Sequence, residues 1–123
     1  MEVHGLGGVV FAVWDVPAMA AVNALKSRAI TLPMTTIDLG HEAAMELASD
    51  GLVKGIGEQQ PYDQGLAAGV ATIIALLGRQ PPPWVALPGL AVEPQNMLAA
   101  YQLVWHAPAP PAILKARKAA AAG

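Results

Sequence analysis

Runs of apolar residues alternate along the first part of the chain with segments whose apolar residues recur at helical spacing. The runs have the length of strands and cover residues 8–14, 32–37 and 53–57, and the helical segments cover residues 15–27, 41–51 and 61–78. Strands that alternate with helices indicate a parallel sheet joined by right-handed crossovers. Because the first run is apolar throughout, it predicts a strand covered on both faces. The pattern therefore predicts a three-layer α/β fold, a parallel sheet with helices on both faces.

The pattern changes after Gly78. Three consecutive prolines at 81–83 indicate an extended connector, and residues 84–87 (WVAL) predict a further strand. Apolar residues at helical spacing predict an amphipathic helix over 94–105. A proline cluster and a lysine- and alanine-rich end follow, so residues 107–123 are predicted to be a mobile tail. The chain is thus expected to form one domain, residues 1–106, and a flexible end.

Composition is that of a single globular domain. Of the 123 residues, 54% are hydrophobic and 13% are charged, so a core can be buried and disorder is not expected for most of the chain. A net charge of -2 provides no basic face for nucleic acid. The absence of cysteine excludes disulfides and thiolate zinc sites. The longest apolar run, residues 66–77, is shorter than the roughly 20 residues that span a bilayer.

Polar side chains stand at the end of each of the three predicted strands. They are Trp14 with Asp15, then Asp38, then Glu58 with Gln59 and Gln60. Ligands of open parallel sheets bind at the carboxyl ends of the strands, where the loops that lead into the helices meet. Carboxylates accept hydrogen bonds from vicinal hydroxyls, an amide donates and accepts, and an indole covers the C–H face of a sugar ring. This set of groups favours a polyhydroxylated ligand.

Structural roles are the alternatives for the same residues. One alternative is that Asp15 is simply a helix N-cap and has no ligand role, since Pro17 falls in the first turn of the helix that follows. Trp14 can belong to the core, and Gln60 can be a solvated cap in front of Pro61.

Catalytic and metal-binding patterns are weak. No serine has a neighbouring histidine, and the histidines lack the spacing of metal ligands; these residues are Ser27, Ser49, His4, His41 and His106. No metal or cofactor is therefore expected. Asp38 and Glu58 at neighbouring strand ends leave open a small α/β enzyme that uses acid/base chemistry. That alternative requires turnover that is lost in an Asp38→Asn variant, and we expect none.

Three stretches of the sequence resemble a known family: FAVWDVPAMAAVNALKS, TTIDLGHEAAMELASDGLVKGIGEQQPYDQG and WVALPGLAVEPQNMLAAY. They are similar to the C-terminal part of the type I periplasmic sugar-binding proteins, the ribose-binding-like substrate receptors of ABC transporters. The resemblance extends from about residue 9 to about residue 105. The QQPYDQG motif is its most specific part, and the WDVPA turn supports it.

The resemblance implies a ligand site at Trp14, Asp15, Asp38 and Gln59. In the family, the residue that matches Asp38 accepts hydrogen bonds from sugar hydroxyls, and the one that matches Gln59 binds from the strand end near the hinge. The strand and helix within 84–106 resemble the last hinge crossing and the closing helix. The implied partners are a sugar or polyol and an ABC transporter permease, and the implied location is the periplasm. Because residues 1–8 (MEVHGLGG) do not have the pattern of a signal peptide, the cytoplasm stays open as a second location.

The sequence also departs from the family pattern. It has no counterpart of the N-terminal lobe or of the first βα units of the C-terminal lobe, which indicates a truncated form or one half of a split protein. Missing strands would leave a sheet edge and apolar helix faces uncovered, so we expect a homodimer or a swapped assembly. A clean monomer at high concentration in light scattering would contradict this. The alternative to a binding module is a structural or regulatory fragment without useful affinity, which acts through self-association or a partner lobe.

Overall fold

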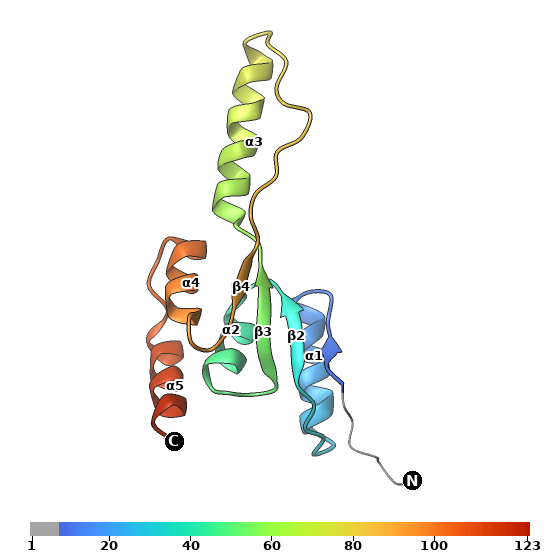
Figure 1. The fold of residues 1–123 in the computed structure, drawn as a ribbon, viewed down its shortest axis with the longest axis vertical. Coiled ribbons are helices and arrows are strands. Elements are labelled where there is room, and N and C mark those ends of the chain that lie inside the picture. Colours follow the sequence, from blue (N-terminus) through green and yellow to red (C-terminus); the bar gives the residue numbers. More distant parts are fainter. Residues whose placement is uncertain (1–7) are drawn as a thin grey trace.

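The computed structural model describes residues 8–123, which form four strands and five helices (Figure 1). The strands are β1 (Val10–Phe11), β2 (Met34–Ile37), β3 (Val53–Glu58) and β4 (Leu90–Val92). The helices are α1 (Asp15–Lys26), α2 (His41–Ala48), α3 (Pro61–Leu76), α4 (Met97–Trp105) and α5 (Pro111–Ala122).

The four strands form one sheet in the order β1-β2-β3-β4. The first three are parallel, as the alternation of strands and helices predicts, and β4 is antiparallel to β3. In the register of the sheet, Thr35 lies opposite Phe11 and Gly55, and Gly57 lies between Ile37 and Ala91. The α/β class predicted from the sequence is confirmed.

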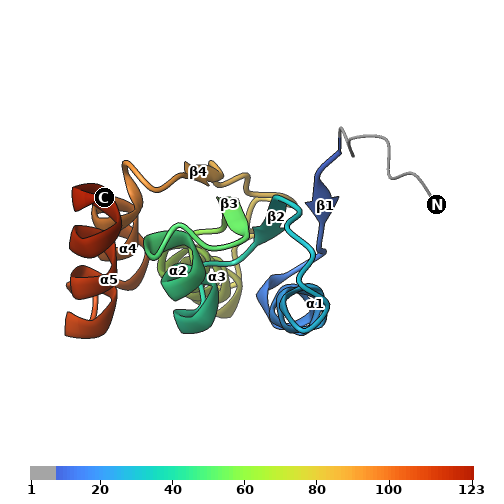
Figure 2. The ribbon, with the colours of Figure 1, turned by 90° about the horizontal axis from the view of Figure 1, so that it is seen from below.

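Within that class, the helices are distributed differently from the three-layer prediction. Figure 2 shows α1 and α2 on the same face of the sheet. This follows from the strand order, because two right-handed crossovers that step in the same direction along a sheet place both helices on one side. Among the described residues the other face is largely uncovered, and Phe11 on β1 is 63% exposed. Helices on both faces would require a reversal of the strand order, and these strands contain none.

The core lies between the sheet and the helices. Met34, Ile56 and Val92 point from three neighbouring strands into it. Three buried alanines on α2 (Ala43, Ala44 and Ala48) let this helix approach the sheet closely. Met97 of α4 and Ile113 of α5, both fully buried, complete the cluster.

The mobile tail predicted for residues 107–123 is corrected by α5. Residues Pro111–Ala122 form a helix that packs against α2 and buries Ile113. Proline is well tolerated in the first turn of a helix, and alanine, lysine and arginine are strong helix formers. The composition rich in proline, alanine and lysine that indicated a mobile tail is thus also that of a helix once an apolar side chain anchors it.

The last strand also lies elsewhere than predicted. The sequence indicated a strand over 84–87, whereas β4 begins at Leu90. Residues 79–89 instead run beside α3, where Val85 and Leu87 line a groove together with Leu66 and Val70 of that helix. The apolar residues of WVAL therefore contact a helix rather than pair in the sheet.

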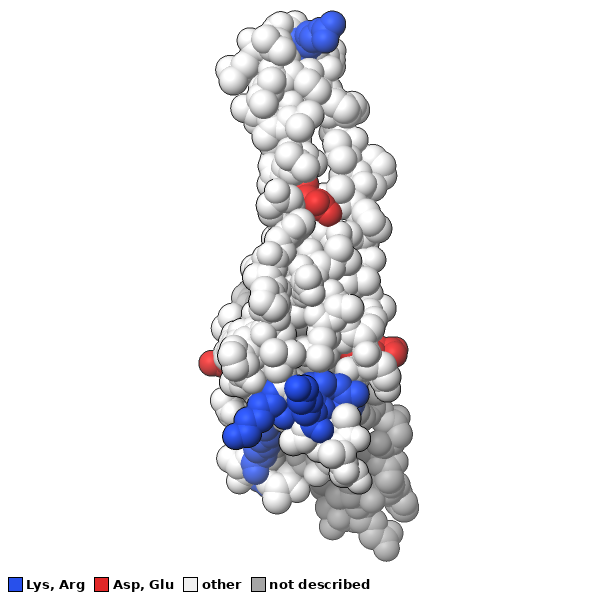
Figure 3. All heavy atoms as spheres, turned by 90° about the vertical axis from the view of Figure 1, so that its left-hand side faces the viewer, with Lys and Arg blue, Asp and Glu red and all other residues white. Residues whose placement is uncertain are grey.

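Helix α3 projects beyond the sheet (Figure 1) and contains no buried residue. Leu66, Ile73, Leu76 and Leu77 are each more than half exposed. Between residues 61 and 89 the sequence has only two charged residues, Asp63 and Arg79, and Figure 3 shows the corresponding surface with few charged side chains. No helix within residues 8–123 is both long enough and apolar enough to cross a membrane.

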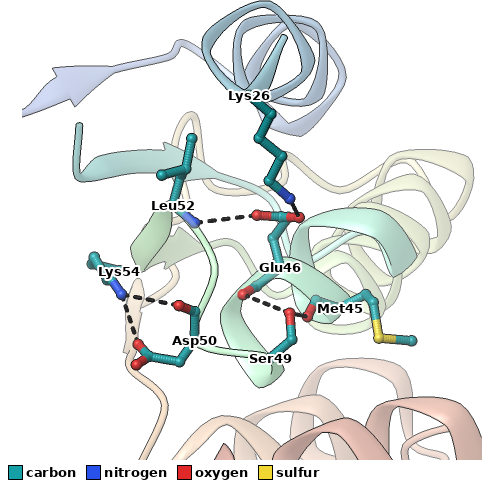
Figure 4. A network of polar contacts seen from close by, with 7 residues as sticks. All are labelled: Lys26, Met45, Glu46, Ser49, Asp50, Leu52 and Lys54. Atoms are coloured by element: carbon teal, nitrogen blue, oxygen red, sulfur yellow. Dashed lines mark hydrogen bonds and ion pairs between the residues drawn. The ribbon is translucent and has the colours of Figure 1, made fainter. Parts of the chain in front are cut away.

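A polar network joins α1, α2 and the start of β3 near the amino ends of the strands (Figure 4). Glu46 of α2 forms an ion pair with Lys26 of α1 and accepts a hydrogen bond of 3.2 Å from the backbone N–H of Leu52. Lys54 forms a second ion pair with Asp50 at 2.6 Å. Both ion pairs therefore lie at the end of the sheet opposite the polar strand ends.

Candidate functional site

A cavity of about 180 Å³ lies at the carboxyl ends of β2 and β3, where α1, α2 and α3 begin. This volume is below the 300–1,000 Å³ that is typical for drug-sized ligands, so the cavity suits a small molecule. Its lining consists of Asp15, Asp38, Leu39, Gly40, Glu58, Gln59, Pro61, Gln64 and Trp105. Three of the four residues predicted as ligand contacts, Asp15, Asp38 and Gln59, are thus brought together.

Asp38 is held in place by its backbone and by a chain of amides. Its φ of 73° lies in the left-handed region, which few residues other than glycine adopt and which is often found at functional positions. Gln59 donates a hydrogen bond of 2.8 Å from Nε2 to Asp38 Oδ1, and Gln64 donates one of 3.2 Å to Gln59 Oε1. The chain fixes the direction in which the Asp38 carboxylate points.

Asp15 is the first residue of α1, and Trp14 occupies the N-cap position without a side-chain cap hydrogen bond. The Asp15 carboxylate is thus not used as the cap that the sequence allowed. It lies against Gly40, the N-cap of α2, and a Cβ at position 40 would collide with Asp15 Oδ2. Gly40 therefore leaves room for a carboxylate beside a helix N-terminus, where negative charge is stabilised.

Glu58 is the buried member of the acidic group. Its side chain is 4% exposed, and its Oε2 atom is buried without a hydrogen-bond partner among the described residues. Burial raises the pKa of Glu58 to about 7; a backbone hydrogen bond with Leu39 opposes the rise, and the negative charges of Asp38 and Asp15 add to it. Near neutral pH the protein therefore contains a mixture of protonated and ionised Glu58.

The aromatic wall of the cavity comes from Trp105 rather than Trp14. Trp105 ends α4, is 46% exposed, and donates a hydrogen bond of 3.1 Å from Nε1 to the carbonyl oxygen of Leu39. Trp14 is 49% exposed and does not line the cavity. From the sequence, Trp105 was predicted only as part of an amphipathic helix. Its place at the site depends on a contact with Leu39, 66 positions away along the chain.

Gln60 has a different role from Gln59. Its Nε2 donates a hydrogen bond of 2.9 Å to the carbonyl oxygen of Pro88, which joins the start of α3 to the segment that leads into β4. Of the two neighbouring glutamines, Gln59 therefore lines the cavity, and Gln60 holds the start of α3 against the segment before β4.

Among residues 8–123, no cationic side chain lines the cavity. Both ion pairs found among residues 8–123 lie at the far end of the sheet. The described part of the chain contains no cluster of three metal-ligating side chains, and His4 lies outside it. The arrangement thus offers carboxylate acceptors, an amide and a half-exposed indole to a small ligand.

No protein-family profile matches the chain, and no curated protein matches it. One solved structure is similar. It is the crystal structure of an ABC sugar transporter subunit from Rhodobacter sphaeroides 2.4.1, with a TM-score of 0.62 and 25% sequence identity. The match covers 70% of this chain and 31% of that chain. The architecture is consistent with part of a periplasmic-binding-protein lobe, and the chain spans about a third of the length of the protein it matches.

Proposed function

We propose that this chain binds a small polyhydroxylated molecule, a sugar or a polyol, in the cavity at the strand ends. The observation that carries the proposal is the convergence of Asp15, Asp38 and Gln59 on one small cavity with an indole beside it. These groups come from separate strand ends and meet only in the folded chain.

The geometry fits the hydrogen bonding of a polyol. A ligand hydroxyl can donate to the Oδ2 atom of Asp38, while the hydrogen bond from Gln59 holds Oδ1. Asp15 supplies a second acceptor beside Gly40. The hydrogen bond from its N–H to Leu39 satisfies the polar atom of the Trp105 ring and holds the ring in place. The exposed part of the ring can then cover the C–H face of a sugar.

A role in sugar uptake is the wider context of this proposal. It is supported by the likeness to an ABC sugar transporter subunit, of which the match covers 31%. We propose that this chain, as part of such a system, has an ABC transporter permease as its partner and is located in the periplasm. A second lobe over the open side of the cavity would complete the enclosure of the ligand.

A thermal-shift screen tests the proposal. We expect at least one member of a panel of pentoses, hexoses, inositols and sugar alcohols at millimolar concentration to raise the melting temperature. Ligand at a hundredfold excess over its Kd adds about 2.7 kcal/mol to the free energy of unfolding, which corresponds to several degrees for a domain of this size. The shift should be lost in Asp38→Asn, which removes the charge of the acceptor.

Asp63→Asn is the matched control, since Asp63 lies on α3 outside the cavity and its replacement should preserve the shift. If no ligand stabilises the protein, or if Asp38→Asn responds like the parent, the proposal is wrong. A structural or regulatory fragment would then be the better description.

A further inference from the structure

Glu58 is the one part of the cavity that the hydrogen-bonding pattern of a neutral sugar does not explain. The side chain is 4% exposed, lines the cavity, and keeps Oε2 buried without a partner among residues 8–123. An unpartnered buried oxygen is destabilising unless something binds to it. Asp38, by contrast, already accepts from Gln59.

In the described part of the chain, the charges that act on Glu58 are negative. Asp38 at the end of β2 and Asp15 at the start of α1 are the charged groups whose fields reach it. The other elements at the cavity contribute uncharged residues: Leu39 and Gly40 before α2, Gln64 on α3 and Trp105 on α4. A neutral ligand would thus exclude water from carboxylates that have no counter-ion among residues 8–123, which is unfavourable.

We propose that the ligand is a polyol with a positively charged amino group, such as an amino sugar or an amino alditol, and that Glu58 receives this group. The inference rests on the proposed function and names the class of its ligand. An ammonium group supplies three N–H donors and one positive charge, so it can satisfy Glu58 Oε2 and balance the neighbouring carboxylates together. The hydroxyls of the same ligand then bind Asp38 and Asp15.

The titration of Glu58 provides a signature of this contact. Near pH 7 part of the protein carries a protonated Glu58, because burial raises its pKa to about 7. An ammonium group beside the carboxyl favours the ionised form. Binding of the amine should therefore release protons to the buffer, and a ligand without charge should not. Calorimetry in two buffers of different ionisation enthalpy measures this release directly.

The test uses pairs of ligands that differ only by an amino group in place of a hydroxyl. The pairs are glucamine with sorbitol, glucosamine with glucose, and galactosamine with galactose. We expect the amine of at least one pair to bind at least tenfold more tightly at pH 7 and to release protons. Glu58→Gln, which has nearly the same shape, should reduce this preference to less than threefold and abolish the release. Circular dichroism checks that the variant is folded, and Asp15→Asn should weaken the preference as a second variant.

Glu93→Gln serves as the control, because Glu93 is exposed and lies outside the cavity. The inference is overturned if the neutral members bind as tightly as the amines, or if the preference survives in Glu58→Gln. In both cases the proposed binding of polyols still stands. If no member of any pair binds, the inference is overturned, and the proposed function is then decided by the pentoses and inositols of the thermal-shift screen.

Discussion

Between pH 5 and pH 8 the parent protein should lose stability relative to its Glu58→Gln variant by on the order of 2 kcal/mol. In the folded protein the Glu58 carboxyl has a pKa of about 7, whereas its ordinary value is 4.5. The folded state thus binds more protons between these pH values. The stabilisation from the neutral carboxyl is complete below the ordinary pKa and is lost as the pH rises through about 7.

Urea unfolding at a series of pH values measures this difference, and all other titrating groups are common to both proteins and cancel. Glu93→Gln should give a curve parallel to that of the parent, since Glu93 is exposed. Parallel curves for the parent and Glu58→Gln would mean that Glu58 is ionised and hydrogen-bonded in the folded protein. The cavity would then contain no buried carboxyl group with a raised pKa.

A double substitution on α3, Ile73→Glu with Leu76→Glu, should convert a self-associating protein into a monomer. We propose that two copies associate through the exposed apolar surface of α3, because α3 has no buried residue and Ile73 and Leu76 are 58% and 82% exposed. Two carboxylates in such an interface would have to be buried without partners. In the monomer they remain in water, where surface substitutions usually change stability by less than about 0.5 kcal/mol.

Light scattering coupled to size exclusion tests this proposal near 100 µM. The parent should have at least twice the monomer mass of 12.7 kDa, and the variant should have the monomer mass. Gln95→Glu with Gln102→Glu adds the same charge at exposed positions in and before α4, and should leave the mass of the parent unchanged. A parent protein that is monomeric at every concentration would show that α3 has no such partner.

The sequence predicted the parts of the fold that depend on local pattern. The three βα units up to residue 78 follow from apolar runs and helical spacing. Strands β1 and β2 lie within their predicted runs, and β3 continues one residue beyond its run, to Glu58. The position of β4 could not be predicted, because Trp84–Leu87 and Leu90–Val92 are both short and apolar, and pairing with β3 selects the second. The docking of α5 depends on one buried side chain, Ile113, within a segment that is otherwise rich in alanine and basic residues.

The candidate site divides in the same way. Asp15, Asp38 and Gln59 were found because the ends of parallel strands converge by rule. Trp105 was missed because its contact with Leu39 depends on how α4 packs against the rest of the fold. Local sequence patterns do not predict a contact between residues that are so far apart along the chain. The burial of Glu58 was missed as well, since a glutamate at a strand end is usually solvated and only tertiary packing covers it.

The proposed ligand site is the cavity between Asp15, Asp38 and Trp105. The most direct measurement is a ¹⁵N NMR titration with ribose, galactose, myo-inositol and glucamine in turn. The chain has three tryptophans and hence three indole N–H signals. At least one ligand should move the Trp105 indole signal together with the Gly40 amide and the Gln59 side-chain amide, while the indole of Trp84, 77% exposed on the segment beside α3, stays in place. If only the signals of α3 and Trp84 move, or if no signal moves with any ligand, the cavity is not the ligand site.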